Sequence, residues 1–435
     1  MNYQEAVDWM FGIRRFGDER TLEPEVRLLE LLGNPERDMK VIHVTGTNGK
    51  GSTCAMSASI LMDAGFRVGL FTSPHLESYT ERIQVNGEQI PEKDVTRLAN
   101  MIRPLCEKLD SEPERVHPLF FDIVTAMGFA YFKEMKADYA VLEVGMGGRL
   151  DATNVITPEV SIITNVSLEH TEVLGDTAVK IAHEKGGIIK PGRPLVTATQ
   201  NPEVLGYFRQ RCAELGSKII HVGTDITFIK KEVSLEGQRF TIHGTRDTYE
   251  VELPLLGDHQ MLNASAAVGA IETLADRGVI VPKDAILEGL RNVSWPGRLE
   301  VMQRSPLVVL DGAKDVEAAK ALAKAVQEFR HKRLIAVVSM SSDKNISEMI
   351  AALAPVVDLF IVTTHGVMGR AADPKIITGE AAKHGKPFQV AATTGEAVER
   401  ALASAEREDM VLVAGSVFLV GEARRSWRCA GSRSR

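Results

Sequence analysis

The sequence predicts an α/β protein with two domains, each built on a mostly parallel sheet covered by helices. Short apolar runs rich in β-branched residues alternate with longer segments of helical period, which is typical of parallel strands joined by helices. The chain has 435 residues, 44% of them hydrophobic, and one hydrophobic core rarely organises that length. A break in the alternation at Ser294-Trp295-Pro296-Gly297 places the domain boundary there.

The first domain is expected to span residues 1–296. Its predicted strands are 41–45, 67–71, 139–144, 160–165 and 194–198. Its predicted helices are 52–64, 95–109, 119–136 and 176–190, the last ended by Pro191-Gly192. Segments 225–230, 238–243 and 247–253 instead resemble antiparallel strands with polar turns. They predict a small β insertion before a helix at 260–277.

The second domain, 297–424, shows the same alternation and is predicted to be Rossmann-like. Strands are expected at 307–310, 333–339, 358–363 and 410–414, and helices at 315–329, 346–353, 374–384 and 395–406. Residues 425–435 are rich in arginine and lack apolar periodicity, which predicts a disordered tail without a function of its own.

Composition excludes several classes of protein. The net charge of −7, with basic residues spread among acidic ones, argues against nucleic-acid binding. The cysteines lie far apart, without metal-ligand spacing or a disulfide framework: Cys54, Cys106, Cys212 and Cys429. The acidic N-terminus lacks signal-peptide features, and no stretch approaches the ~20 apolar residues of a membrane span. We therefore expect a soluble cytoplasmic protein.

The strongest motif is the run VTGTNGKGST at 44–53, between a predicted strand and a predicted helix. Glycines let backbone N–H groups turn toward an anion, the helix N-terminus favours negative charge, and Lys50 supplies a cation for phosphate. Ser52 is placed to reach phosphate or Mg²⁺. The common P-loop spacing is not met, because Gly51 intervenes, and a simple glycine-rich turn is the alternative. The predicted nucleotide-binding residues here are Thr47, Asn48, Gly49, Lys50, Gly51 and Ser52.

Further motifs carry a family resemblance. They are TSPHL at 72–76, EVGMGGRLDATN at 143–154, HEKGGIIK at 183–190, GDHQMLNA at 257–264 and WPGR at 295–298. With TGTNGKGS at 45–52, these segments resemble the folylpolyglutamate synthase/dihydrofolate synthase branch of the Mur ligase superfamily, from about residue 38 to about 424.

The resemblance implies an ATP-dependent ligase that joins L-glutamate to the carboxylate of dihydropteroate or a folate through an acyl phosphate, releasing ADP and phosphate. It also implies two Mg²⁺ sites, with ligands among Ser52, Ser73, Glu143, His170 and Lys185. The matching lysine of the family is carbamylated, so a carbamate is expected on Lys185. The alternatives are a structural ion pair for Glu143, a structural role for His170 and a solvated Lys185.

The same resemblance assigns nucleotide-side roles to Gln260, Asn263, Arg298 and Asp311. Residues 311–315, DGAKD, stand where the family has DGAHN, so Lys314 replaces histidine and Asp315 replaces asparagine. Lys314 is therefore expected to meet phosphate as a permanent cation. The predicted catalytic residues are Lys50, His170, Lys185, Asp311 and Lys314.

The acceptor side is expected near the segment PLFFDIVTAM at 118–127, which resembles the family's stretch near the pterin. Predicted substrate residues are Phe120, Phe121, Asp122 and Thr125. The two phenylalanines would stack on a flat heterocycle, or would alternatively pack into the core.

Two other functions stay open from the sequence. One is a related Mur-type amide ligase with a different acceptor, either a modified pterin or a UDP-muramoyl peptide. The other is an ATP-binding switch that makes no amide, for which the metal-type residues Glu143, His170 and Lys185 are unnecessary. The expected partners are small molecules, and a monomer is expected.

Overall fold

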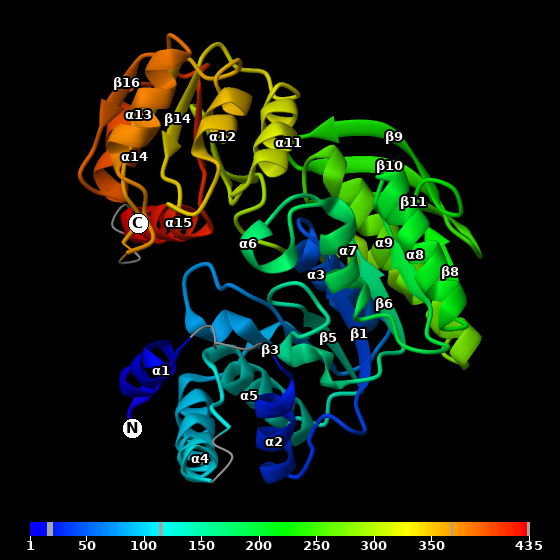
Figure 1. Cartoon of the computed structure of the whole chain (residues 1–435). Coiled ribbons are helices and arrows are strands. Elements are labelled where there is room, and N and C mark those ends of the chain that lie inside the picture. The colour runs from blue at the N-terminus through cyan, green and yellow to red at the C-terminus, as the bar shows by residue number, and fades with distance from the viewer. Residues whose placement is uncertain (15–20, 113–115, 367–368, 433–435) are drawn as a thin grey trace. The chain divides into compact units, whose positions relative to one another are not determined.

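A computed structural model describes residues 1–14, 21–112, 116–366 and 369–432 (Figure 1). The chain divides into two compact units, which we describe separately. Unit 1 comprises Met1–Lys230, Phe240–Glu252 and Met261–Val293, and unit 2 comprises Lys231–Arg239, Leu253–Gln260 and Ser294–Arg435. Within the described ranges, no helix is long and apolar enough to cross a membrane.

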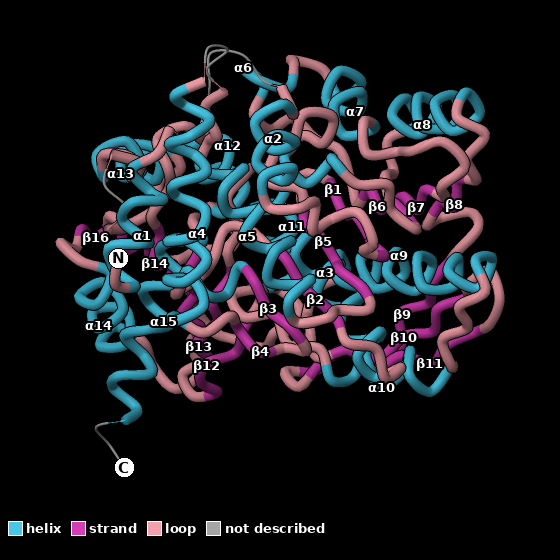
Figure 2. The backbone as a smooth tube through the Cα atoms, turned by 90° about the horizontal axis from the view of Figure 1, so that it is seen from below, coloured by secondary structure: helices cyan, strands magenta, loops and turns pink. Residues whose placement is uncertain are grey.

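The main sheet of unit 1 has eight strands in the order β4-β3-β2-β5-β1-β6-β7-β8 (Figure 2). The strands are β1 (Lys40–Thr45), β2 (Val68–Phe71), β3 (Ile83–Val85), β4 (Glu88–Gln89), β5 (Tyr139–Glu143), β6 (Val160–Ile163), β7 (Leu195–Thr197) and β8 (Ile219–His221). All neighbouring pairs from β2 to β8 are parallel, whereas β3 and β4 add antiparallel pairs at one edge. Because β5 and β6 flank β1, the loops that follow these three strands meet at one edge of the sheet.

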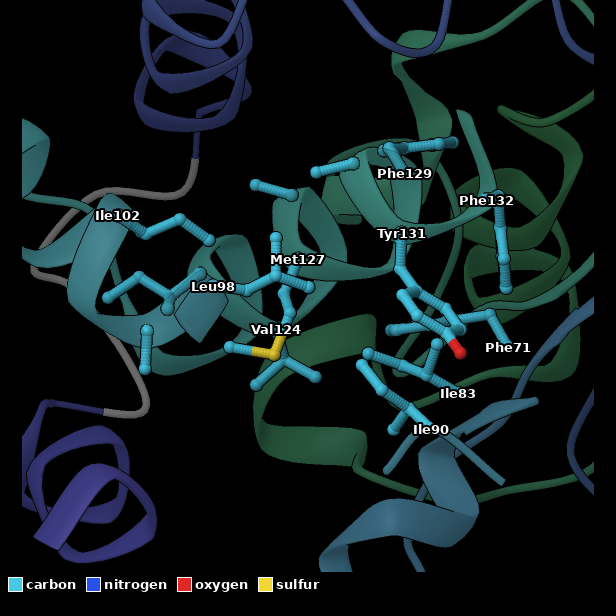
Figure 3. Close-up of a cluster of buried hydrophobic side chains, with 14 of the residues drawn as sticks. Phe71, Ile83, Ile90, Leu98, Ile102, Val124, Met127, Phe129, Tyr131 and Phe132 are labelled. Atoms are coloured by element: carbon cyan, nitrogen blue, oxygen red, sulfur yellow. The ribbon is translucent and has the colours of Figure 1, made fainter. Parts of the chain in front are cut away.

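Helices of unit 1 cover this sheet. They are α1 (Tyr3–Gly12), α2 (Glu23–Leu31), α3 (Lys50–Asp63), α4 (Glu92–Ser111), α5 (Phe120–Glu134), α6 (Thr171–Leu174), α7 (Ala178–Gly186), α8 (Pro202–Glu214) and α10 (Lys283–Asn292), with α9 (Asp258–Leu274) beginning in unit 2. Short 3-10 helices occur at η1 (Tyr79–Arg82), η2 (Ala152–Val155) and η3 (Ala275–Arg277). Helix α5 is buried almost throughout, and Figure 3 shows its Val124, Met127 and Phe132 among side chains from β2, β3 and α4.

A second sheet contains three strands in the order β11-β10-β9: β9 (Thr227–Ser234), β10 (Gly237–His243) and β11 (Thr248–Leu253). Its turn at 244–247 is bound by buried Glu272 of α9. The Glu272 carboxylate accepts from the backbone N–H groups of Thr245 (2.7 Å) and Arg246 (3.1 Å) and from the Tyr249 hydroxyl (2.9 Å). The predicted insertion is therefore anchored directly on the helix that follows it.

Unit 2 contains a six-stranded sheet in the order β12-β13-β17-β14-β15-β16. The strands are β12 (Glu300–Arg304), β13 (Leu307–Asp311), β14 (Leu334–Val338), β15 (Leu359–Val362), β16 (Phe388–Val390) and β17 (Met410–Ala414). All pairs are parallel except β12 with β13. The helices are α11 (Val316–Val326), α12 (Ile346–Leu353), α13 (Pro374–Lys383), α14 (Thr394–Ser404) and α15 (Val417–Ser432). The α/β fold class predicted for both parts of the chain is confirmed.

Helix α15 extends beyond residue 424, the predicted end of the second domain. It runs to Ser432, while 433–435 lie outside the described residues. The helix is anchored by buried Leu419, Val420 and Ala423. The disordered tail expected over 425–435 stays a prediction.

Helix α10 approaches α3 at Gly289, and this contact gives a first prediction. A Cβ atom at Gly289 would lie 2.4 Å from the Cα of Ile60 and 2.6 Å from its backbone nitrogen. Because the neighbouring atoms belong to the backbone of Ile60, they cannot move aside as a flexible side chain could. Gly289→Ala should therefore lower the free energy of unfolding by about 1–3 kcal/mol, measured by urea denaturation. Gly206→Ala on α8 is the matched control, because a Cβ there meets nothing within 4 Å. It should stabilise by up to ~1 kcal/mol, and equal midpoints for the two variants would contradict the close approach.

Candidate active site

The phosphate-loop motif connects β1 to α3. Gly46 has φ +150° and Gly49 has φ +83°, conformations that favour glycine. A Cβ at Gly46 would lie 1.8 Å from the Thr164 Oγ1, so the loop also passes too close to β6 for a side chain. The glycines are therefore required by the path of the backbone, as the motif predicts.

Residues that follow β6 hold this loop in shape. The Asn165 Oδ1 accepts from the Asn48 backbone N–H (2.8 Å), and the Thr164 hydroxyl donates to the Asn48 carbonyl (2.6 Å). The Ser167 backbone N–H donates to the Thr47 Oγ1 (3.0 Å). No role was predicted for these three residues from the sequence. The available signal was their position directly after a strand that neighbours β1.

Predicted nucleotide-side groups gather around the loop. The Lys50 ammonium donates to the carbonyl oxygens of Gly46 (3.0 Å) and Thr47 (3.2 Å), so it lies over the loop. Ser52 is buried in the first turn of α3, next to half-buried Gly51. Asn263 of α9 touches the same loop, because a Cβ at Gly49 would lie 2.3 Å from its Oδ1. The loop and Asn263 therefore form one site within unit 1.

Glu143 and Ser73, two of the predicted metal ligands, lie together. Glu143 ends β5 and is 5% exposed, and its Oε2 accepts from the Ser73 backbone N–H at 2.9 Å. Ser73 follows β2, the strand beside β5. His170 follows β6 in a left-handed conformation (φ 51°, ψ 42°), with its Nε2 3.6 Å from the Glu169 Oε1. These groups extend from the edge of the sheet where β1 also ends.

Lys185 lies on α7, and its side chain is 3% exposed. The segment after β5 is bound to this helix. Arg149 pairs with Glu184 at 2.9 Å, and a Cβ at Gly148 would lie 3.0 Å from the Lys185 carbonyl oxygen. Among the described residues, no three His, Cys, Asp or Glu side chains gather into a metal site. Mg²⁺ is a hard cation that prefers oxygen ligands. The predicted ligands therefore fit Mg²⁺ only if serine hydroxyl oxygens and an oxygen atom carried by Lys185 join the Glu143 carboxylate.

Asp122 is the charged group of the predicted acceptor side. It is buried at the start of α5 and accepts from the Leu119 backbone N–H at 2.7 Å. Burial, with a smaller contribution from the charge of Asp151, raises the pKa of Asp122 to about 7, although that hydrogen bond lowers it. Thr125, one turn later, is also buried. Phe121 packs over the backbone of Gly145, since a Cβ there would lie 2.6 Å from its Cζ.

Phe120 is placed differently from Phe121. Its ring stacks on Phe11 at 5.1 Å with an interplanar angle of 17°, and the Arg82 guanidinium lies 5.6 Å from its centroid. It is buried in the hydrophobic cluster around α5. These surroundings fit core packing, the alternative role considered for Phe120. The packing partner Phe11 comes from an N-terminal helix that was not predicted from the sequence.

In unit 2, Asp311 anchors the loop that precedes β12. Its carboxylate accepts from the backbone N–H groups of Leu299 (2.9 Å) and Ala313 (2.8 Å). Arg298, in the loop before β12, lies against Gly312, which follows β13, because a Cβ at Gly312 would be 2.3 Å from the Arg298 guanidinium. His259 is half-buried nearby, and burial lowers its pKa, opposed by the charge of Asp311. His259 belongs to the GDHQMLNA motif, but no role was predicted for it from the sequence.

Lys314 and Asp315 follow in the altered family loop. Lys314 is half-buried, and Asp315 is the N-cap of α11, accepting from the Ala318 backbone N–H at 2.9 Å. Asparagine and aspartate cap helices about equally well, so Asp315 preserves this local function. Lys314 is therefore the residue of this loop that changes the chemistry of the family motif.

Gln260, a predicted nucleotide-side residue, lies on the first turn of α9 and is buried.

Comparisons with known proteins agree with these features. A family model of the Mur ligase middle domain matches residues 44–271, and one of the Mur ligase glutamate ligase domain matches 297–417. The dihydrofolate synthase/folylpolyglutamate synthase of Bacillus subtilis is 38% identical over 355 residues, 81% of this chain and 82% of that protein. The structure of Mycobacterium tuberculosis folylpolyglutamate synthase complexed with ADP is 31% identical, with a TM-score of 0.91 over 98% of both chains.

The archaeal relatives are longer. A probable bifunctional folylpolyglutamate synthase/dihydropteroate synthase of Haloferax volcanii is 38% identical over 98% of this chain, which spans only 51% of that protein.

A structure of Escherichia coli FolC in complex with DHPP and ADP is 28% identical, with a TM-score of 0.88 over 100% of this chain and 99% of that one. From the matched motifs, the domain models and these relatives, the chain belongs to the folylpolyglutamate synthase/dihydrofolate synthase family of Mur ligases.

Proposed function

We propose that this protein is an ATP-dependent, ADP-forming ligase that adds L-glutamate to a pterin carboxylate. The observation that carries the proposal is the joint placement of the phosphate loop, Asn263, Glu143 and Ser73 around the carboxyl ends of β1 and β5. A phosphate-binding loop alone would suit any ATP-binding protein. A buried carboxylate and a serine beside it are the additional groups that metal-assisted phosphoryl transfer needs.

The chemistry assigned to unit 1 is phosphoryl transfer. The backbone N–H groups of the loop and the Lys50 ammonium would bind the phosphates of ATP, and Asn263 would lie on the nucleotide side. Ser52, Ser73, Glu143, His170 and a carbamylated Lys185 would hold Mg²⁺ at two sites. When bound, Mg²⁺ neutralises phosphate charge that would repel an incoming carboxylate. The transfer converts the acceptor carboxylate to an acyl phosphate, and the amine of glutamate displaces phosphate from it.

A carbamate on Lys185 is proposed on physical grounds as well as on the family resemblance. The side chain is 3% exposed, and burying an ammonium beside a divalent cation is unfavourable. Reaction of the neutral amine with CO₂ would form an N–C bond and release one proton, leaving an anionic oxygen donor of the kind that Mg²⁺ prefers.

Unit 2 is assigned the remaining groups of the reaction. Arg298 presents a guanidinium, which suits phosphate, next to Asp311 and Gly312. Lys314 adds a permanent cation where the family uses histidine, and Gln260 lies on the helix that carries Asn263. The glutamate substrate is assigned to this unit because a glutamate ligase domain model matches residues 297–417.

For the acceptor, we propose dihydropteroate, a folate, or both. Support comes from Asp122, Thr125 and Phe121 near the loop after β5, and from the E. coli relative whose structure contains DHPP. The archaeal relatives carry a name that joins a folylpolyglutamate synthase to a dihydropteroate synthase, which favours testing dihydropteroate first.

The test is a set of reactions that each omit one component. Purified protein with MgATP is given glutamate together with dihydropteroate, tetrahydrofolate or a UDP-muramoyl peptide, and ADP and the amide product are measured by mass spectrometry. We expect ADP release only when glutamate and a pterin carboxylate are both present. ADP production without either substrate would favour the ATP-binding switch. Product with only the UDP-muramoyl peptide would favour the other ligase.

A further inference from the structure

A carboxyl group buried without a hydrogen-bond partner lies on helix α2. Glu25 is 0% exposed, and neither of its carboxyl oxygens has a hydrogen-bond partner among the described residues. An ionised carboxylate in such surroundings is strongly unfavourable. We therefore expect the Glu25 side chain to be a neutral acid in the folded protein.

The neighbours of Glu25 reinforce this state. Helix α2 packs against α5, α4 and the 3-10 helix η2. Burial raises the pKa of Glu25 well above its ordinary value, as do the charges of Asp122 on α5, Asp151 at the N-cap of η2, and Glu36 after α2. The single basic residue of α2, Arg27, pairs with Glu112 of α4 at 2.7 Å. Within the described residues, the charges that act on Glu25 are therefore all negative.

The two carboxyl groups nearest to Glu25 accept hydrogen bonds, whereas Glu25 accepts none from the described residues. Asp151 accepts from the Thr153 hydroxyl (2.6 Å), the Thr153 backbone N–H (3.1 Å) and the Met146 backbone N–H (3.0 Å). Asp122 accepts from the Leu119 backbone N–H (2.7 Å). Glu25 is therefore the carboxyl group of this cluster whose charged form has no donor within the described part of the chain.

We propose that α2 is a pH-sensitive wall of the acceptor side of the site, docked while Glu25 is a neutral acid and released when Glu25 ionises. The acceptor side is the face of α5 that carries Asp122 and Thr125, and its role rests on the function proposed above. Thr125 is buried, and its hydroxyl also has no hydrogen-bond partner among the described residues. Helix α2 also buries Leu28 and Leu29, and Leu31 packs against the same core, so ionisation of Glu25 must outweigh the loss of these apolar contacts for the helix to be released.

The sign of the pH dependence follows from the raised pKa. The docked helix holds a proton that the released helix loses above the ordinary pKa of glutamate, near 4.5. Docking is therefore strongest at low pH and weakens by about tenfold per pH unit until the pKa of docked Glu25 is reached. Asp122, with a pKa of about 7, also titrates in this range, so the Glu25 variants described below identify the contribution of Glu25.

Hydrogen exchange of the full chain tests the release directly. After correction for the intrinsic exchange rate, the opening constant of the α2 amides should rise with pH between pH 5.5 and 9, by up to about tenfold per pH unit, and level off where docked Glu25 ionises. The amides of α3 serve as an internal reference that should not follow this slope. A wild-type opening constant that is independent of pH would overturn the proposal.

Variants separate Glu25 from general destabilisation. Glu25→Gln and Glu25→Leu cannot ionise, so both should abolish the slope. Glu23→Gln removes an exposed carboxylate from the same helix and should keep it. If Glu25→Gln loosens α2 through its own buried amide, Glu25→Leu still provides the test, because a slope that survives in the leucine variant contradicts the assignment.

A separate hydrogen-exchange experiment tests whether α2 borders the acceptor site. Dihydropteroate should lower the opening constant of α2 in the wild type at pH 9, and no change at saturating dihydropteroate would overturn the role of α2 as a wall. Failure of the proposed function is distinguishable, because it would appear as the absence of amide product at every pH.

Discussion

Lys50→Ala should lower the rate of amide synthesis by about 10²- to 10³-fold, the loss expected when one charge-stabilising group is removed from a transition state. The Lys50 ammonium lies over the phosphate loop, where it donates to the Gly46 and Thr47 carbonyl oxygens. The substitution removes no buried apolar volume, so the thermal midpoint should change little. Steady-state rates with MgATP, glutamate and the active pterin would measure the loss.

The matched control for Lys50 is Lys133→Ala, which removes an exposed lysine from α5 in the same unit. Its rate should stay within about twofold of the wild type, since surface substitutions away from special features have small effects. If Lys50→Ala turned over at the rate of this control, the loop would not position the transferred phosphate.

Lys185→Ala should be nearly inactive, and a small carboxylate such as acetate should restore part of the activity. The alanine side chain leaves space that a free carboxylate can enter, which replaces the oxygen donor of the proposed carbamate. Wild-type activity should also fall when CO₂ and bicarbonate are stripped at mildly acid pH, because the carbamate forms from the neutral amine. Added bicarbonate should reverse this fall.

A readout independent of turnover completes the Lys185 test. Protein equilibrated with ¹³C-bicarbonate should show a carbamate carbon signal that is absent from Lys185→Ala, while Lys190→Ala serves as the lysine control five residues along the chain. Lys190 is half-buried and donates to the Asn154 carbonyl at 3.1 Å. A spectrum without a carbamate signal in active, Mg²⁺-loaded protein would leave Lys185 as an unmodified cation.

Local patterns predicted the central elements well. The strands β1, β5 and β6 and the helices α3 and α5 were expected within a few residues of their bounds, because buried strands and long helices impose clear periods on the sequence. The short elements α1, α2 and β3 were missed. Their positions depend on contacts made across the fold, such as Phe11 on Phe120.

The candidate site was predictable only where a motif carried it. Lys50 and Glu143 were predicted from the sequence motifs that contain them. In the structure, Lys50 lies over the phosphate loop, and the Glu143 carboxylate accepts a hydrogen bond from the Ser73 backbone N–H. Asn165 and Thr164 were not assigned, because their contact with the loop depends on β6 lying beside β1, which no local pattern encodes. Glu25 was overlooked for a similar reason, since an acidic residue in the first turn of a helix is normally solvated.

The anchoring of the β10–β11 turn on Glu272 has a practical consequence for protein engineering. Surface turns between strands usually tolerate inserted tags, fluorophore-bearing loops or new chain termini. The turn at 244–247 should not, because its backbone N–H groups bind a buried carboxylate of α9, the helix that also carries Asn263 beside the phosphate loop. An insertion there would remove these backbone donors from the Glu272 carboxylate and would disturb the proposed nucleotide site from a distance. The surface turn after Lys190, where a Cβ at Gly192 meets nothing within 4 Å, is the better site for such a graft.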